Sequence, residues 1–157
     1  DGCKKTCEIL EKEFHNHSLI KTCLIDKQPL FSGSVRQFGI NCSSGEIICY
    51  LDSDDTMLPI HTETIVNNIS DADWVYFNHI WAWPNRMYQE IDTELIHGRI
   101  GTSSIAHKKT VDASWLGCDG YGHDWKFIEK LISGSSKYKK IKNTGYLVRH
   151  IPGKFEN

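Results

Sequence analysis

The sequence predicts an α/β fold in which helices cover a mainly parallel central sheet. Helical and strand-like segments alternate along the 157 residues, with no internal repeat, low-complexity tract or evident linker between them. One of the strand-like segments, IICYL at residues 47–51, is an uninterrupted apolar run, as is typical of a strand buried on both faces of a parallel sheet. Because a chain of this length can bury a core of its own, we expect a single domain over residues 1–157.

The spacing of apolar residues predicts the individual elements in order. In the first third of the chain we expect a helix with Cys7, Leu10 and Phe14 on one face, a strand at 21–25, a helix at 33–42, a turn at 43–46 and the strand at 47–51. In the middle of the chain we expect a helix with Ile60, Ile65 and Ile69, a strand at 73–83 and a strand with a turn at 101–109. In the last part we expect a helix at 123–132 and two short strands at 137–151. The inward residues of the helix at 123–132 are expected to be Trp125, Ile128, Leu131 and Ile132.

The charge balance excludes some classes of partner. The formal net charge is −2, with 18 basic and 20 acidic residues, which argues against a general binder of nucleic acid or anionic membrane. No apolar stretch approaches the roughly 20 residues that a membrane-spanning helix needs, and residues 1–5 have no signal-peptide pattern. We therefore expect no nucleic-acid partner and no transmembrane segment. Because the chain begins at Asp1 rather than Met, we also expect an N-terminally truncated domain.

The cysteine pattern favours a reducing compartment. The six cysteines form no CxxC pair and have no zinc-ligand spacing, and Cys49 lies within an apolar run where a small buried thiol fits. Three Asn-x-Ser sequons, at Asn16, Asn41 and Asn68, point more weakly to a secretory compartment. We expect reduced, structural cysteines and a cytoplasmic location.

Three carboxylates, Asp52, Asp54 and Asp55, follow the apolar run directly, with Pro59 just beyond. Ligands of open α/β sheets bind at the carboxyl ends of the strands. Carboxylates crowded there repel one another unless a cation compensates them. Mg²⁺ and Mn²⁺ prefer oxygen ligands and leave positions for substrate phosphates, so the pattern predicts a metal–diphosphate site. Alternatively, these residues cap the following helix or form a solvated turn.

The residues around the carboxylates make the pattern more specific. GSVRQFGINCSSGEIICYLDSDDTMLP (33–59) resembles the family-2 glycosyltransferases of the GT-A fold, which carry an Arg-Asn-x-Gly helix, a small-residue turn with Gly-Glu, an apolar strand, Leu-Asp-x-Asp-Asp and a nearby Pro. The matching residues are Arg36, Gly39, Gly45, Glu46, Leu51, Asp52, Asp54, Asp55 and Pro59. Gln37 stands where the family usually has Asn.

Two further stretches resemble the family in the same order. In YGHDWKFIEKL, Asp124 matches the acidic residue of the Glu-Asp motif that opens a helix, while His123 replaces the Glu. In the family this Asp is the general base of an inverting transfer. Asp1-Gly2 resembles the Asp-Gly-Ser after the family's second strand, where the Asp contacts the nucleotide base. The resemblance covers most of the chain, but the family's first strand, helix and second strand have no counterpart.

The resemblance implies a GT-A-like three-layer sandwich that transfers a sugar, with inversion, from a UDP- or GDP-sugar to a carbohydrate, lipid-linked or protein acceptor. It implies Mn²⁺ or Mg²⁺ held by Asp54, with Asp52 or Asp55 assisting, and places Asp52 in the donor site as well. Arg36 would contact the diphosphate or nucleotide; a helix-surface ion pair is the alternative. Asp124 would accept the proton of the acceptor hydroxyl; a helix N-cap is the alternative.

Several other side chains have two interpretations. His150 is either a metal or diphosphate contact or, more simply, a surface histidine. Trp81 and Trp83 alternate onto one strand face and suit an acceptor platform, whereas these residues and Trp74 also suit core packing, which we favour.

Two alternative functions also fit. CYLDSDDTML resembles the first motif of haloacid-dehalogenase-type phosphatases, with Asp52 as nucleophile, Asp54 as acid/base, and Asp119 and Asp124 binding Mg²⁺; this leaves residues 36–46 unexplained. The other alternative is a nucleotide-sugar-binding module that has lost turnover.

Overall fold

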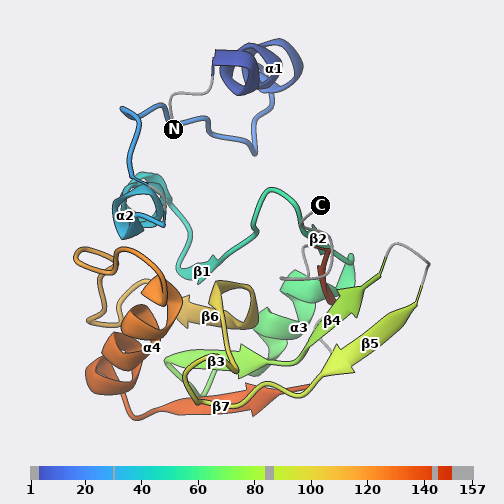
Figure 1. The fold of residues 1–157 in the computed structure, drawn as a ribbon, viewed down its shortest axis with the longest axis vertical. Helices are drawn as coiled ribbons and strands as arrows, with labels where there is room; N and C mark the ends of the chain where they lie inside the picture. The colour runs from blue at the N-terminus through green and yellow to red at the C-terminus, as the bar shows by residue number, and fades with distance from the viewer. Residues whose placement is uncertain (1–3, 30, 84–86, 143–144, 150–157) are drawn as a thin grey trace. The chain divides into compact units, whose positions relative to one another are not determined.

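The computed structural model describes residues 4–29, 31–83, 87–142 and 145–149 (Figure 1). Asp1, Gly2 and His150, which the sequence analysis singled out, lie outside the described residues. The chain divides into two compact units, one formed by Asp1–Ser44 with Ser114–His123 and the other by Gly45–Ala113 with Asp124–Asn157. A single catalytic domain over residues 1–157 stays a prediction.

The first unit contains two helices, α1 (Lys4–Phe14) and α2 (Gly33–Cys42), both expected from the sequence. The start of α2 is set by Ser32, whose side chain accepts a hydrogen bond from the backbone N–H of Ser34 and so caps the helix. No residue of α1 is buried. The predicted strand at 21–25 is wrong, because residues 20–29 have no regular structure and pair with no strand in the described chain.

The second unit contains two four-stranded sheets (Figure 1). The first sheet has the order β1 (Ile47–Cys49), β6 (Ile105–Lys108), β3 (Trp74–Phe77) and β7 (Tyr138–Ile141). The second has the order β2 (Thr56–Met57), β8 (Tyr146–Val148), β4 (His79–Ala82) and β5 (Tyr88–Ile91). The helical elements are α3 (Ile60–Asn68), the 3₁₀ turn η1 (Thr102–Ser104) and α4 (His123–Gly134), whose first residue belongs to the first unit.

The predicted mainly parallel GT-A sandwich is wrong, because most strands pair antiparallel. Among the described strands, only β3 with β7 and β4 with β8 are parallel, and the other four pairings are antiparallel. The apolar run at 47–51 had suggested a central strand buried on both faces. In the described sheet it forms the edge strand β1, which is paired with β6 alone. Of the run, only Ile48 is buried, and Leu51 lies beyond the strand and is exposed.

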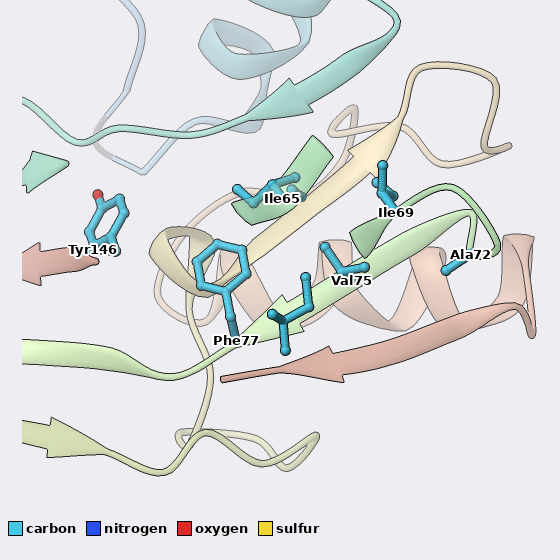
Figure 2. Close-up of a cluster of buried hydrophobic side chains, with 8 residues drawn as sticks. Ile65, Ile69, Ala72, Val75, Phe77 and Tyr146 are labelled. Carbon is cyan, nitrogen blue, oxygen red and sulfur yellow. The ribbon is translucent and has the colours of Figure 1, made fainter. Parts of the chain in front are cut away.

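The core of the second unit lies between α3 and β3. Ile65 comes from α3 and Ile69 from the C-cap that follows it, while Val75 and Phe77 share one face of β3 because side chains alternate along a strand (Figure 2). Tyr146 of β8 lies at one end of this cluster, next to Phe77 in the view of Figure 2, and its side chain is fully buried. The core therefore reaches the second sheet through a residue that carries a polar hydroxyl.

The aromatic segment at 73–83 is broken into two strands of different sheets, β3 and β4, at Asn78. The Asn78 amide donates to Glu90 Oε1 at 2.9 Å, and its oxygen accepts the backbone N–H of Thr93 at 3.1 Å. These bonds satisfy a polar side chain that is buried at the break. The prediction of one continuous strand is therefore wrong.

The helix predicted at 123–132 is confirmed as α4. Its buried face consists of Phe127, Ile128 and Leu131, which follow helical spacing. The expected inward position of Ile132 is wrong, since this side chain is 37% exposed.

Candidate functional site

The acidic loop lies between the edge strand β1 and the short strand β2 in the second unit. The backbone N–H of Asp55 donates to the carbonyl of Asp52 at 3.1 Å and closes a turn around Ser53 and Asp54. The three carboxylates expected at a strand end are therefore held together by a turn of their own backbone.

Tyr146 fixes both ends of this turn from β8. Its hydroxyl donates to Asp55 Oδ2 at 2.9 Å and accepts the backbone N–H of Asp52 at 3.2 Å. The other oxygen of Asp55, Oδ1, accepts the backbone N–H of Arg149 at 2.9 Å. Both oxygens of Asp55 thus serve to anchor the loop to β8 and the residue that follows it. Sequence reasoning missed Tyr146, because the tyrosine lies 91 positions from Asp55 and only the strand pairing joins them.

Burial dominates the electrostatics of this anchor. Burial raises the pKa of Asp55. The hydrogen bonds from Arg149 and Tyr146 stabilise the carboxylate and act to lower this pKa, while the charges of Asp54 and Asp52 raise it by a smaller amount. Burial and the neighbouring Asp55 charge likewise raise the pKa of the Tyr146 hydroxyl, which therefore stays protonated and able to donate.

Asp54 differs from its two neighbours. Its side chain is exposed, and within the described part of the chain no hydrogen bond or ion pair engages its carboxylate. Asp52 is half-buried and participates in interactions of its own. Of the three carboxylates, Asp54 is the one whose side chain is exposed to solvent.

Asp124 lies in the first turn of α4, where a carboxylate also interacts favourably with the helix dipole. Its Oδ1 accepts a hydrogen bond from the hydroxyl of Thr102, a buried residue of η1. A methyl group at the neighbouring Gly101 would lie 3.3 Å from Oδ2 of Asp124, so the glycine leaves room beside that oxygen. The Asp124 side chain is half-buried, and the hydroxyl of Thr102 orients its carboxylate.

The elements that hold Asp55 and Asp124 are neighbours within the second unit. The strand β8, which carries Tyr146, lies against η1, which carries Thr102. Ser104 of η1 is in turn hydrogen-bonded to Nδ1 of His79 at 2.8 Å, which ties η1 to β4. The acidic loop and Asp124 are therefore attached to one connected group of elements.

Arg36 lies in the first unit, on α2. Its guanidinium is placed over the ring of Trp115, 5.1 Å from the centroid, as in a cation–π contact. The adjacent Gln37, which departs from the family's Asn, accepts the N–H of Trp115 at 2.9 Å and the hydroxyl of Ser114 at 3.0 Å. Gln37 therefore holds the segment 114–115 on α2. The expected contact of Arg36 with a diphosphate stays a prediction.

Two more predicted residues of the first unit make local contacts. The ring of His123 stacks on Phe31 with centroids 5.4 Å apart, and its Nδ1 donates to the carbonyl of Gly120 at 3.2 Å. Oδ1 of Asp119, a magnesium ligand in the phosphatase interpretation, accepts the N–H of Gly33 at 2.9 Å. These contacts organise the turn that leads into α4.

The tryptophans separate into two groups. Trp74 is fully buried, with its indole N–H donating to the carbonyl of Ser135 at 3.1 Å, so its expected core role is confirmed. Trp81 and Trp83 are half-buried, with ring centroids 6.1 Å apart in an edge-on contact. Their predicted role as an acceptor platform stays a prediction.

No protein-family model matches the chain, and no curated protein sequence matches it either. Among the described residues, no three or more His, Cys, Asp or Glu side chains are grouped as a ready-made metal site. None of the helices in the described ranges combines the length and the apolar character that a bilayer crossing requires.

Proposed function

We propose that this protein is a metal-dependent glycosyltransferase that moves a sugar, with inversion, from a nucleotide-diphosphate donor to an acceptor hydroxyl. The proposal rests on a difference between two carboxylates of the acidic loop. Asp55 accepts hydrogen bonds from Tyr146 and Arg149, whereas Asp54 is exposed to solvent and has no partner among the described residues. A loop that only capped a helix or formed a solvated turn would not require a buried tyrosine to fix both its ends.

The donor set suits a cation that is shared with a diphosphate. Mg²⁺ uses one or two protein carboxylates and takes its remaining ligands from phosphates and water. Asp54 with Asp52 would supply that number, so three grouped protein ligands are not required. Bound there, Mn²⁺ or Mg²⁺ would neutralise the charge that develops on the leaving diphosphate. Asp55, which was also expected to assist, has a structural role in this proposal because both its oxygens accept hydrogen bonds.

Asp124 is the proposed general base. Thr102 holds Oδ1 and so orients the carboxylate, whose Oδ2 lies beside Gly101; this carboxylate would take the proton of the acceptor hydroxyl. The acceptor oxygen then attacks the anomeric carbon from the face opposite the bond that breaks, and the nucleoside diphosphate leaves. The donor would be a UDP- or GDP-sugar, and the acceptor a carbohydrate, a lipid-linked glycan or a protein. The proposal includes a cytoplasmic location, which is supported by a sequence with no CxxC pair and no zinc-ligand spacing among its cysteines.

A donor-cleavage assay tests this function. Release of UDP or GDP from a panel of sugar nucleotides is measured with Mn²⁺, with and without simple sugar acceptors. Asp124→Asn should lower the rate by about 10²–10⁴-fold, the usual contribution of a general base, while leaving donor binding intact. Asp112→Asn, which removes an exposed carboxylate of the same unit, should behave as the unchanged protein.

Other outcomes would overturn the proposal. Metal-dependent donor binding without any release of nucleotide would identify a binding module. Hydrolysis of p-nitrophenyl phosphate with a phosphoaspartate trapped at Asp52 would identify a phosphatase.

A further inference from the structure

In the first unit, the irregular segment 21–28 lies along α2. Near its beginning, Nζ of Lys21 donates to the carbonyl of Cys42, the last residue of the helix, at 3.1 Å. At its other end, the hydroxyl of Ser34 in the first turn of α2 donates to Oε1 of Gln28 at 3.0 Å. The segment therefore runs antiparallel to the helix and is fastened to it at both ends.

This arrangement brings two thiols together. Cys23 and Cys42 share a side-chain hydrogen bond, both are free, and both are partly exposed. The hydrogen bond raises the pKa of Cys23, while the charge of Lys21 acts in the opposite direction. The pair is thus close enough to interact and accessible to a small oxidant. Two of the other described cysteines are less accessible or less reactive: Cys118 is buried, and burial raises the pKa of Cys49 to about 11.

We propose that Cys23 and Cys42 are a redox modification site that is converted to a disulfide by low-molecular-weight disulfides such as oxidised glutathione. The thiolate of one cysteine attacks a sulfur of glutathione disulfide, breaks its S–S bond and releases one glutathione thiolate, which takes up the displaced proton. The second cysteine then attacks the mixed disulfide and releases the second glutathione. In total, two protein thiols are oxidised and one glutathione disulfide is reduced to two thiols.

The cross-link would have a structural effect in the first unit. It joins the irregular segment covalently to the end of α2, where the described structure holds it by hydrogen bonds. Closing the loop from Cys23 to Cys42 restricts the unfolded chain and so raises the stability of the oxidised form. This inference does not depend on the proposed activity, and its test needs no substrate.

Peptide mapping of the full chain tests the pairing. The protein is incubated with glutathione disulfide at mildly alkaline pH, which increases the thiolate fraction, then alkylated and digested without reduction. We expect the peptide that carries Cys23 to be linked to the peptide that carries Cys42, with Cys7, Cys49 and Cys118 recovered as alkylated thiols. Reduction with dithiothreitol should release both peptides.

Three controls distinguish the proximity of Cys23 and Cys42 from a general reactivity of the cysteines. Cys7→Ser, which removes another partly exposed thiol of the same unit, should leave the linkage unchanged, whereas Cys23→Ser should leave Cys42 as a mixed disulfide with glutathione. The same oxidation in denaturing guanidinium chloride should give mixed pairings. The proposal is wrong if the native protein yields no Cys23–Cys42 peptide, or yields it no more often than the denatured chain does.

Discussion

The two units of this chain are stabilised in different ways. The second unit has a contiguous core in which Ile65, Val75 and Phe77 are at most 1% exposed. The first unit has a helix, α1, with no buried residue, and several of its large apolar side chains are exposed, among them Leu19 at 89% and Leu24 at 67%. Its described contacts include individual polar ones, such as those of Gln37 with Ser114 and Trp115.

This difference shows which sites each unit can support. A reactive carboxylate needs rigid surroundings, and the acidic loop obtains them from Tyr146, which is itself a member of the core of the second unit. A unit in which large apolar side chains such as Leu19 and Leu24 stay exposed gains more from a covalent cross-link, and the cysteine pair lies in this unit. Three stability measurements test this difference between the two units.

The largest effect should come from the core of the second unit. Phe77→Ala removes a buried ring and leaves a cavity, so we expect a loss of about 3–5 kcal/mol in the free energy of unfolding. Phe38→Ala, in the first unit, removes a ring that is 39% exposed and should cost about 1 kcal/mol or less. Urea denaturation of both variants measures the difference. Equal losses would remove the contrast between the units.

The next effect depends on pH. Burial lowers the pKa of His79 to about 4, from an ordinary value of about 6.5. As the pH falls through this range, the unfolded chain binds a proton that the folded chain does not, so stability is lost, by up to about 3 kcal/mol. Burial lowers the pKa of His107 as well, which adds to the same slope.

Urea midpoints between pH 6.5 and 4 measure this dependence. His79→Gln keeps a polar group for Ser104 and should flatten the pH dependence, while His15→Gln, which changes an exposed histidine of the first unit, should leave it as it is. A slope that is the same in all three proteins would contradict the buried, neutral state of His79.

The smallest effect compares two glycines of α2. A methyl group at Gly33 would lie 2.2 Å from the carbonyl oxygen of Trp115 and 2.7 Å from that of Cys118, so Gly33→Ala should force the backbone apart and cost about 1–3 kcal/mol. Nothing lies within 4 Å of a methyl group at Gly39, so Gly39→Ala should stabilise the helix by about 0.5–1 kcal/mol. Thermal unfolding of the two variants should therefore shift in opposite directions. Shifts of the same sign would show that the segment 115–118 is not packed on Gly33.

Local patterns predicted the helices better than the sheets. Apolar spacing located α2, α3 and α4, because helix contacts are local in sequence. The predicted direction and burial of strands were wrong where long-range pairing decides them. The apolar run at 47–51 is compatible with either a central or an edge strand, and only its antiparallel pairing with β6 makes it an edge in the described sheet.

The same distinction holds for the candidate site. The sequence identified Asp52, Asp54 and Asp55 as a cluster at a strand end, and Asp124 at a helix start, because each depends on neighbouring residues alone. It gave no signal for the hydroxyls of Tyr146 and Thr102, which reach Asp55 and Asp124 through the tertiary structure. It also did not distinguish the anchored Asp55 from the exposed Asp54.

The most direct test of the central claim is calorimetric titration of UDP and GDP into the protein with and without Mn²⁺. We expect binding of at least one nucleotide only when the metal is present. This binding should be lost in Asp54→Asn, which keeps the shape of the side chain and removes its charge, and retained in Asp112→Asn. If neither nucleotide binds in the presence of Mn²⁺, or if Asp54→Asn binds as well as the unchanged protein, Asp54 does not hold a metal–diphosphate site.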